Sequence, residues 1–232
     1  MHDKKIIDMF RIPIFEFKFK DHELYRQQWI DTLETPGMWR DKSGNADRTF
    51  KVTSPNLHKD DRFNPLRVFF LECLYSVVGE SCGIHADVGI TSMWVTKHEK
   101  NGYHHSHTHG NTFFAGVYYL DSDSENPAGT EFENVMSDFY SFNRLKIYDT
   151  NRTLQSSSFQ STSEVSFERG KLIIFPGWLR HKTQQNPGEK RYIFGWNTMP
   201  IGYNNNDYYD RYHYADFRDT FLIGDDLNDF EK

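Results

Sequence analysis

The sequence has few cysteines and no long apolar run. Its two cysteines, Cys73 and Cys82, form neither a metal-ligand nor a redox pair, so we expect two free thiols in a reducing compartment. No stretch approaches the roughly 20 apolar residues of a membrane span, and residues 1–8 lack the apolar core of a secretory signal. These absences predict a soluble, cytoplasmic protein without membrane association.

Basic residues are outnumbered by acidic ones. Lys+Arg number 27 and Asp+Glu 33, which gives a net charge of −6, and no block of the sequence is basic. General nucleic-acid binding is therefore not expected. Aromatic residues are plentiful, at 16% with 20 Phe and 13 Tyr, and they favour a mainly β interior with supporting helices.

A chain of 232 residues is long enough for one sizeable core, and we expect residues 1–232 to form a single domain. Residues 1–87 would supply a strand and buttressing helices, and residues 88–199 the β core. Residues 200–232 would be an extension that packs on the outside or across a partner subunit, which leaves a homodimer open.

Local patterns predict the elements of the first third. Residues 10–19 alternate in polarity and carry Pro13, which predicts an edge strand. Helical spacing predicts one helix from Asp21 or His22 to Pro36, and another from Asn64, as its N-cap, to Gly79. The polar residues 40–64 between the helices are interpreted as a surface segment and part of a lid.

The sequence from residue 88 onward predicts mainly β-strands. Trp94 is interpreted more as a core anchor than as a substrate contact, and Gly116 as allowing close approach of another chain segment. The long polar segment 136–163 is interpreted as a gate over a site, with short strands at 145–148 and near 158–159. Further strands are expected at 88–96, 112–120, 129–135, 171–175 and 191–198, with a loop at 121–129 and a hairpin turn at 186–188.

Histidines are concentrated at the entry to one strand. Four of the eleven lie within six residues, at His104, His105, His107 and His109. Side chains two residues apart on an extended segment share a face, so His107 with His109, or alternatively His105 with His107, could bind one metal ion. His181, after the strand at 171–175, is the expected third ligand, with His104 and His105 as outer groups. Three such ligands with open positions are typical of non-haem Fe(II) oxygenases.

Arg191 opens a later apolar strand. A guanidinium is always charged and costly to bury unless it meets an anion, and its planar fork matches a carboxylate. The position therefore predicts a carboxylate-bearing cosubstrate beside the metal.

These motifs resemble the 2-oxoglutarate and Fe(II)-dependent oxygenases over roughly residues 88–199. The resemblance is greatest to a branch common in phage and marine bacterial genomes, and it implies a double-stranded β-helix, a jelly roll similar to the cupin barrel. It also implies Fe(II) on His107, His109 and His181, and the distal carboxylate of 2-oxoglutarate on Arg191, aided by Tyr119 or Asn197. Hydroxylation of an unidentified substrate would accompany decarboxylation to succinate. The motifs are Trp94, Gly102, His107-Thr-His109, Ala115-Gly-Val-Tyr-Tyr119, residues 129–134, 175–181 and 191–197.

The sequence departs from this family at one ligand, because most members carry Asp or Glu where His109 stands. A carboxylate from Glu131 or Asp121 could approach the metal instead. The alternative functions are a cupin-type metal enzyme or binder without 2-oxoglutarate, favoured by the spacing of Gly170, Pro176 and His181, and a non-catalytic structural module.

Overall fold

The computed structural model describes residues 11–40, 50–84, 88–136 and 161–200. Four expectations fall wholly or partly outside these residues: the strands at 145–148 and 158–159, the gate at 136–163, the lid segment at 40–64 through its residues 41–49, and the extension at 200–232. None of the helices in the described ranges is long and apolar enough to cross a membrane.

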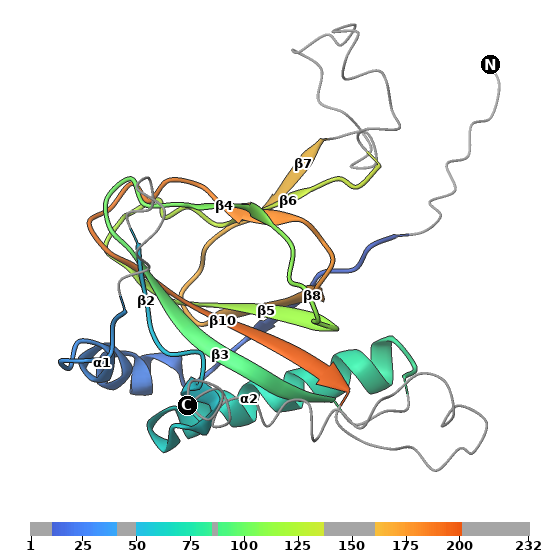
Figure 1. The fold of residues 1–232 in the computed structure, drawn as a ribbon, viewed down its shortest axis with the longest axis horizontal. Coiled ribbons are helices and arrows are strands. Elements are labelled where there is room, and N and C mark those ends of the chain that lie inside the picture. The colour runs from blue at the N-terminus through green and yellow to red at the C-terminus, as the bar shows by residue number, and fades with distance from the viewer. Residues whose placement is uncertain (1–10, 41–49, 85–87, 137–160, 201–232) are drawn as a thin grey trace, which may run out of the picture.

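Two antiparallel sheets face each other (Figure 1). The larger has six strands in the order β1-β8-β5-β10-β3-β2, and the smaller has four in the order β4-β9-β6-β7. The expectation of a mainly β protein is confirmed, and the predicted strand at 10–19 lies at a sheet edge as β1. The strands are β1 Phe15–Lys18, β2 Phe50–Val52, β3 Val88–His98, β4 His104–His107, β5 Phe114–Ser122, β6 Thr130–Glu133, β7 Thr162–Val165, β8 Lys171–Pro176, β9 His181–Thr183 and β10 Arg191–Pro200.

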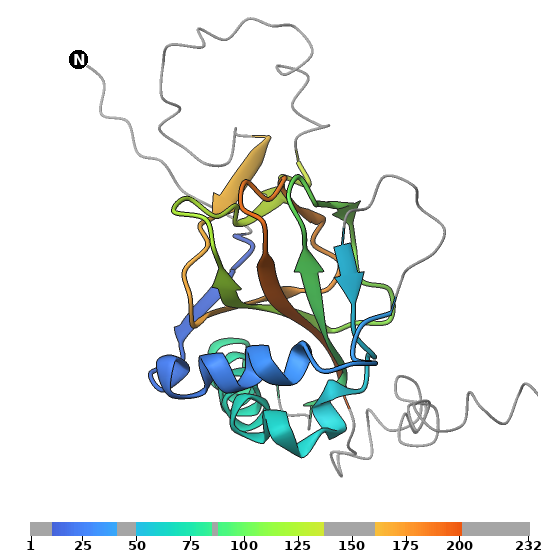
Figure 2. The same ribbon diagram turned by 90° about the vertical axis from the view of Figure 1, so that its left-hand side faces the viewer.

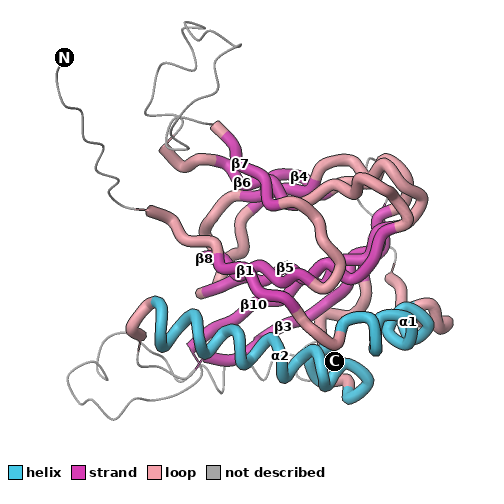
Figure 3. The backbone as a smooth tube through the Cα atoms, turned by 180° about the vertical axis from the view of Figure 1, so that it is seen from behind, coloured by secondary structure: helices cyan, strands magenta, loops and turns pink. Residues whose placement is uncertain are grey.

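Two helices cover the outer face of the larger sheet, as Figures 2 and 3 show. They are α1, His22–Leu33, and α2, Asn64–Tyr75, which continues as a π-helical segment over Ser76–Ser81. Both predicted helices are confirmed. The predicted cap is off by one position, because Phe63 is the N-cap of α2 and Asn64 its first helical residue. Two 3₁₀ turns, Leu57–Lys59 and Asp61–Phe63, precede α2.

The strand β10 divides its side chains between two cores. Tyr192, Phe194 and Trp196 point to the helices and join the larger core, whereas Ile193 packs between the sheets with Phe175 of β8. This division follows from the alternation of side chains along a strand. Arg191 and Asn197 therefore point into the space between the sheets, on the same face as Ile193.

Two glycines make room for indole rings. A Cβ at Gly116 would lie 2.1 Å from Cε2 of Trp196, and one at Gly195 would lie 2.7 Å from Cζ2 of Trp94. The close approach expected at Gly116 is thus the approach of the Trp196 side chain from the neighbouring strand.

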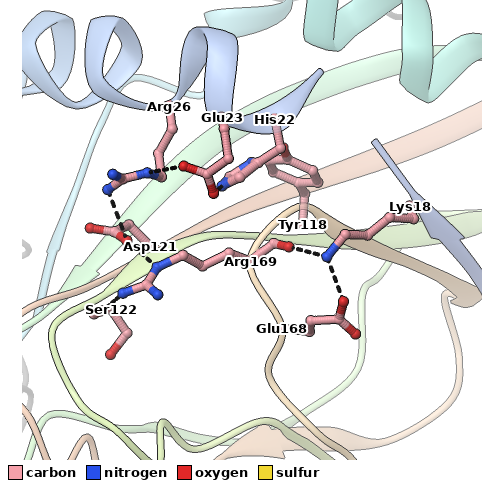
Figure 4. A network of polar contacts seen from close by, with 9 residues as sticks. All are labelled: Lys18, His22, Glu23, Arg26, Tyr118, Asp121, Ser122, Glu168 and Arg169. Atoms are coloured by element: carbon pink, nitrogen blue, oxygen red, sulfur yellow. Dashed lines mark hydrogen bonds and ion pairs between the residues drawn. The ribbon is translucent and has the colours of Figure 1, made fainter. Parts of the chain in front are cut away.

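A polar network fastens α1 to the end of the larger sheet (Figure 4). Nδ1 of buried His22 lies 2.6 Å from the Tyr118 hydroxyl, and Asp121 pairs with Arg26 of the helix and with Arg169. The helix is therefore held at a fixed place against β5 by contacts at its first turns.

Four sequence predictions need correction. Residues 40–64 are not only a surface segment: β2 pairs with β3, and Leu57 and Phe63 are buried. The histidine cluster, expected at the entry to the strand at 112–120, itself forms a separate strand, β4, paired with β9. The turn at 186–188 joins strands of opposite sheets, so it is no hairpin. The strand β7 was not predicted, because its residues are polar and mostly exposed.

Candidate metal centre and anion site

Three histidines meet between the sheets at one end of the sandwich. His107 ends β4, His181 begins β9, and the two are register partners. His109 follows β4 and its backbone N–H donates to the Gly177 carbonyl at 2.9 Å, in the turn after β8. One ring nitrogen from each histidine lies within 4.8 Å of the other two. The structure therefore brings together His107, His109 and His181, whereas His105 is exposed.

Each of the three rings is held at Nδ1 by an oxygen acceptor. Nδ1 of His107 lies 2.7 Å from the His105 carbonyl, and Nδ1 of His181 lies 2.9 Å from the Leu179 carbonyl. Nδ1 of His109 lies 2.5 Å from Oδ1 of Asn197. A carbonyl oxygen cannot donate, so each Nδ1 carries the proton and each Nε2 presents a lone pair. Such outer contacts are what orient histidine ligands around a metal.

The three rings fit a divalent metal ion. Nε2 of His109 and Nε2 of His181 are 3.3 Å apart, and two lone pairs at that distance favour a cation between them. Burial lowers the pKa of His109 to about 4 and that of His181 to about 3. Both rings are thus neutral near pH 7, the form that binds metals, and imidazole suits Fe, Zn and Cu.

Aromatic rings form the wall beside the triad. Trp94 of β3 stacks on His109 at 6.0 Å between ring centroids, and Phe175 contacts His181 edge-on at 4.7 Å. Trp94 is only half-buried. It therefore borders the site rather than anchoring the core, which corrects the sequence interpretation.

The two carboxylates considered as additional ligands are engaged elsewhere. Glu131 accepts from Lys182 at 2.9 Å and from Gln184 at 2.6 Å. Asp121 pairs with Arg26 and Arg169 at the other end of the larger sheet. Among the described residues, the group of possible ligands at this centre contains three histidines and no carboxylate.

A buried cation lies on the same inner face of the larger sheet. Arg191, at the start of β10, is 0% exposed. Its Nη1 donates to the Ala128 carbonyl at 2.8 Å and its Nη2 to the Gln184 carbonyl at 3.2 Å. No carboxylate of the described residues pairs with it, and burial lowers the pKa of Arg191 to about 10. A buried charge in this state is compensated when an anion binds.

The other two predicted residues lie at opposite ends of this face. Tyr119 is buried near Arg191, and its hydroxyl donates to Oγ1 of Thr130 at 2.8 Å. Asn197 lies six residues beyond Arg191 along β10 and contacts His109. The structure thus brings Tyr119 to the arginine and Asn197 to the histidine triad.

Sequence reasoning missed two residues of this region. Thr130 is fully buried beside Tyr119, and His98 is buried opposite Arg191 in the register of β3 and β10. A single threonine after a loop carries no signal in the sequence. His98 could have been found only by pairing two strands that are more than 90 residues apart in the chain.

Comparisons with known proteins agree with this geometry. Residues 92–197 match a family model described as "Putative 2OG-Fe(II) oxygenase". A comparison with curated protein sequences gave no match. The matched segment includes the three histidines, Arg191, Tyr119 and Asn197.

Solved structures of similar fold were also found. The epimerase SnoN from nogalamycin biosynthesis, described as non-heme and alpha ketoglutarate dependent, is 9% identical with a TM-score of 0.61, over 82% of this chain and 77% of its own. A Pseudomonas putida prolyl-4-hydroxylase is 9% identical with a TM-score of 0.57, over 80% and 92%. HygX from Streptomyces hygroscopicus, with nickel and 2-oxoglutarate bound, is 14% identical with a TM-score of 0.57, over 83% and 85%.

These likenesses confirm the double-stranded β-helix fold. The fold and the three-histidine centre define the class, a β-sandwich protein with a candidate three-histidine metal site. Within that class, residues 92–197 are similar to the 2-oxoglutarate and Fe(II) oxygenases. The phage and marine bacterial branch stays a prediction.

Proposed function

We propose that the chain is a 2-oxoglutarate- and Fe(II)-dependent dioxygenase that hydroxylates a substrate still to be identified. One 2-oxoglutarate and one O₂ would give succinate, CO₂ and a new hydroxyl group on the substrate. The observation that carries the proposal is Arg191, a buried cation with no carboxylate partner in the described residues, on the inner face that also borders the histidine triad.

His107, His109 and His181 would hold the metal through their Nε2 atoms. The Nδ1 contacts to two backbone carbonyls and to Asn197 keep the three rings in place before the ion arrives. Fe(II) bound there would supply the redox chemistry that couples decarboxylation to oxygen insertion. HygX has been solved with iron bound and with 2-oxoglutarate, which supports the same pair of cofactors for this fold.

Arg191 would bind the distal carboxylate of the cosubstrate. Its two carbonyl contacts hold the guanidinium in place but neutralise none of its charge, so an incoming carboxylate would gain a charge-assisted hydrogen bond in a dry site. Tyr119 and Thr130, already joined by a hydrogen bond, lie beside it and offer two further hydroxyl groups. The apolar Ile193 and Phe175 would exclude water from the space between arginine and triad.

The binding of 2-oxoglutarate to the anaerobic Fe(II)-loaded protein tests this proposal. We expect a visible metal-to-ligand charge-transfer band on addition of 2-oxoglutarate. His181→Ala should abolish the band, and Arg191→Ala should weaken 2-oxoglutarate binding at least 10-fold, the effect of losing a charged hydrogen bond. Arg62→Ala, at an exposed arginine outside this site, is the matched control.

Two outcomes would contradict the proposed function and point to a different one. A protein that binds metal but shows neither a band nor affinity for 2-oxoglutarate would be a cupin-type metal binder. A protein that holds no metal after anaerobic reconstitution would be a non-catalytic module.

A further inference from the structure

His98, the last residue of β3, is enclosed without a hydrogen-bond partner for its ring. The residue is 1% exposed, and neither Nδ1 nor Nε2 has a partner among the described residues. Its backbone is fixed, because Nδ2 of Asn186 donates to the His98 carbonyl at 3.2 Å. Buried polar groups in folded proteins are almost always hydrogen-bonded. The two unpaired ring nitrogens therefore indicate that a bound molecule supplies a hydrogen-bond partner.

The neighbours of His98 indicate what that partner is. His98 and Arg191 are register partners on adjacent strands, and directly opposed side chains on one face have Cβ atoms about 5 Å apart. Of the three nitrogens of the Arg191 guanidinium, only Nε lacks a hydrogen-bond acceptor among the described residues. The unpaired nitrogens of both residues are thus enclosed in one region.

The ring of His98 is a neutral donor in this setting. Burial and the nearby Arg191 charge hold the pKa of His98 well below its ordinary value. One ring nitrogen of a neutral imidazole carries a proton, and this N–H can donate to an acceptor. The Phe50 ring packs against His98 at 5.6 Å between centroids and shields it from solvent.

A carboxylate meets the needs of both residues at once. Its negative charge compensates Arg191, and its two oxygens can accept separately from a guanidinium and from the one N–H of the His98 imidazole, whose other ring nitrogen is an acceptor and needs a different donor. A water molecule could accept the same hydrogen bonds, but it would leave the charge of Arg191 uncompensated.

We propose that His98 is a binding residue for the 2-oxo acid: it donates a ring N–H to one oxygen of the distal carboxylate, while Arg191 binds the other. This inference rests on the proposed function. It makes His98 a determinant of cosubstrate choice, since a 2-oxo acid without a distal carboxylate would leave both residues unpaired.

The test compares two cosubstrates in three proteins. Affinities for 2-oxoglutarate and for 2-oxovalerate, the same chain without the distal carboxylate, are measured by calorimetry on Co(II)-loaded wild type, His98→Phe and His98→Gln. We expect His98→Phe to weaken 2-oxoglutarate binding 10- to 100-fold and to change 2-oxovalerate binding less than 3-fold. His98→Gln keeps a side-chain donor and should recover most of the loss.

The matched control is His22→Gln. His22 is also buried with a lowered pKa, but it contacts Tyr118 on the helix-covered face of the sheet. This variant should bind both 2-oxo acids as the wild type does. Equal 2-oxoglutarate affinity in wild type and a folded His98→Phe would overturn the role of His98 and leave the proposed function intact. Absence of 2-oxoglutarate binding in the wild type itself would overturn both.

A measurement on the wild-type chain covers the case in which His98→Phe does not fold. In the Zn(II)-loaded protein labelled with ¹⁵N-histidine, 2-oxoglutarate should shift the ring-nitrogen signals of His98, assigned through His98→Gln, and slow exchange of its N–H. 2-Oxovalerate should do neither. Unchanged His98 signals with saturating 2-oxoglutarate would overturn the proposal.

Discussion

At the scale of single residues, hydrogen-bond acceptors at Nδ1 hold the three histidine rings of the site in place. Two of the three histidines contact backbone carbonyls through Nδ1, and only His109 depends on a side chain, Asn197. A carbonyl cannot be removed by mutation, but the asparagine can. Asn197 is therefore the position where the outer contact of a candidate metal ligand can be altered without changing the ring itself.

Replacement of Asn197 by leucine, which has a similar volume, should weaken metal binding. The change removes the acceptor that fixes the proton of His109 on Nδ1, so the ring can turn or change tautomer. We expect a 10- to 100-fold loss of Co(II) affinity, measured by titration of the metal-free protein with absorbance detection.

Asn197→Asp is the control for this prediction, because it keeps an acceptor at the same place and should hold Co(II) at least as tightly as the wild type. Equal metal affinity in wild type and Asn197→Leu would show that the Nδ1 contact does not matter for the ligand.

At the scale of elements, the packing of the larger sheet depends on glycines that leave space for large side chains on neighbouring strands. Trp196 of β10 lies over Gly116 of β5 and also stacks on Phe70 of α2 at 5.2 Å. One indole thus links two strands and a helix. The absence of a side chain at Gly116 is what lets the sheet and α2 approach each other.

Gly116→Ala should destabilise the fold by about 1–3 kcal/mol, the usual cost of forcing extra atoms into a packed core. The new Cβ would lie 2.1 Å from a ring atom of Trp196, which is packed on its other side and cannot yield easily. Urea denaturation followed by circular dichroism measures the effect. Gly79→Ala, where no atom lies within 4 Å of the new Cβ, should cost much less, and similar losses at both glycines would refute the packing argument.

The sequence predicted the elements whose side chains repeat regularly and missed those that depend on distant partners. The strands β3, β5 and β10 and both helices have side-chain patterns that can be recognised, and β8 is a continuous apolar run. In contrast, β2 has three residues, too few for its alternation to be recognised, and β4 is formed of histidines and serine and has no apolar pattern. Their pairing with β3 and β9 stabilises them. The gathering of His181 with His107 was inferred from residue type, whereas His98 opposite Arg191 follows only from the strand register.

At the scale of the whole molecule, buried neutral histidines link stability to pH. Burial lowers the pKa values of His22, His58, His98, His109 and His181, to about 4 for His22. The unfolded chain binds protons near pH 6.5, whereas the folded chain resists them until lower pH. The histidine contribution to the free energy of unfolding is thus fully present above pH 6.5 and is lost as the pH falls towards 4.

We therefore expect the metal-free protein to lose stability between pH 6.5 and 4, by about 1.4 kcal/mol per pH unit for each of His22, His109 and His181. Urea midpoints at pH 7.0, 5.5 and 4.5, taken with a chelator present, measure the trend. His22→Gln removes one titrating group and should give a shallower loss than the wild type. A free energy of unfolding that is flat over this range would mean that the buried histidines gain their protons without unfolding.

The connection between β9 and β10 separates the His181 ring from the Arg191 guanidinium. His181 begins one strand, Arg191 begins the next, and the two strands belong to opposite sheets. The turn between them is fixed at Asn186, whose side chain donates to the carbonyls of His98, Glu99 and Gly188. If the proposed function holds, the gap between the two sheets, held by Asn186, would set the distance between the His181 ring and the Arg191 guanidinium. That distance would in turn limit the length of the 2-oxo acid that can reach both.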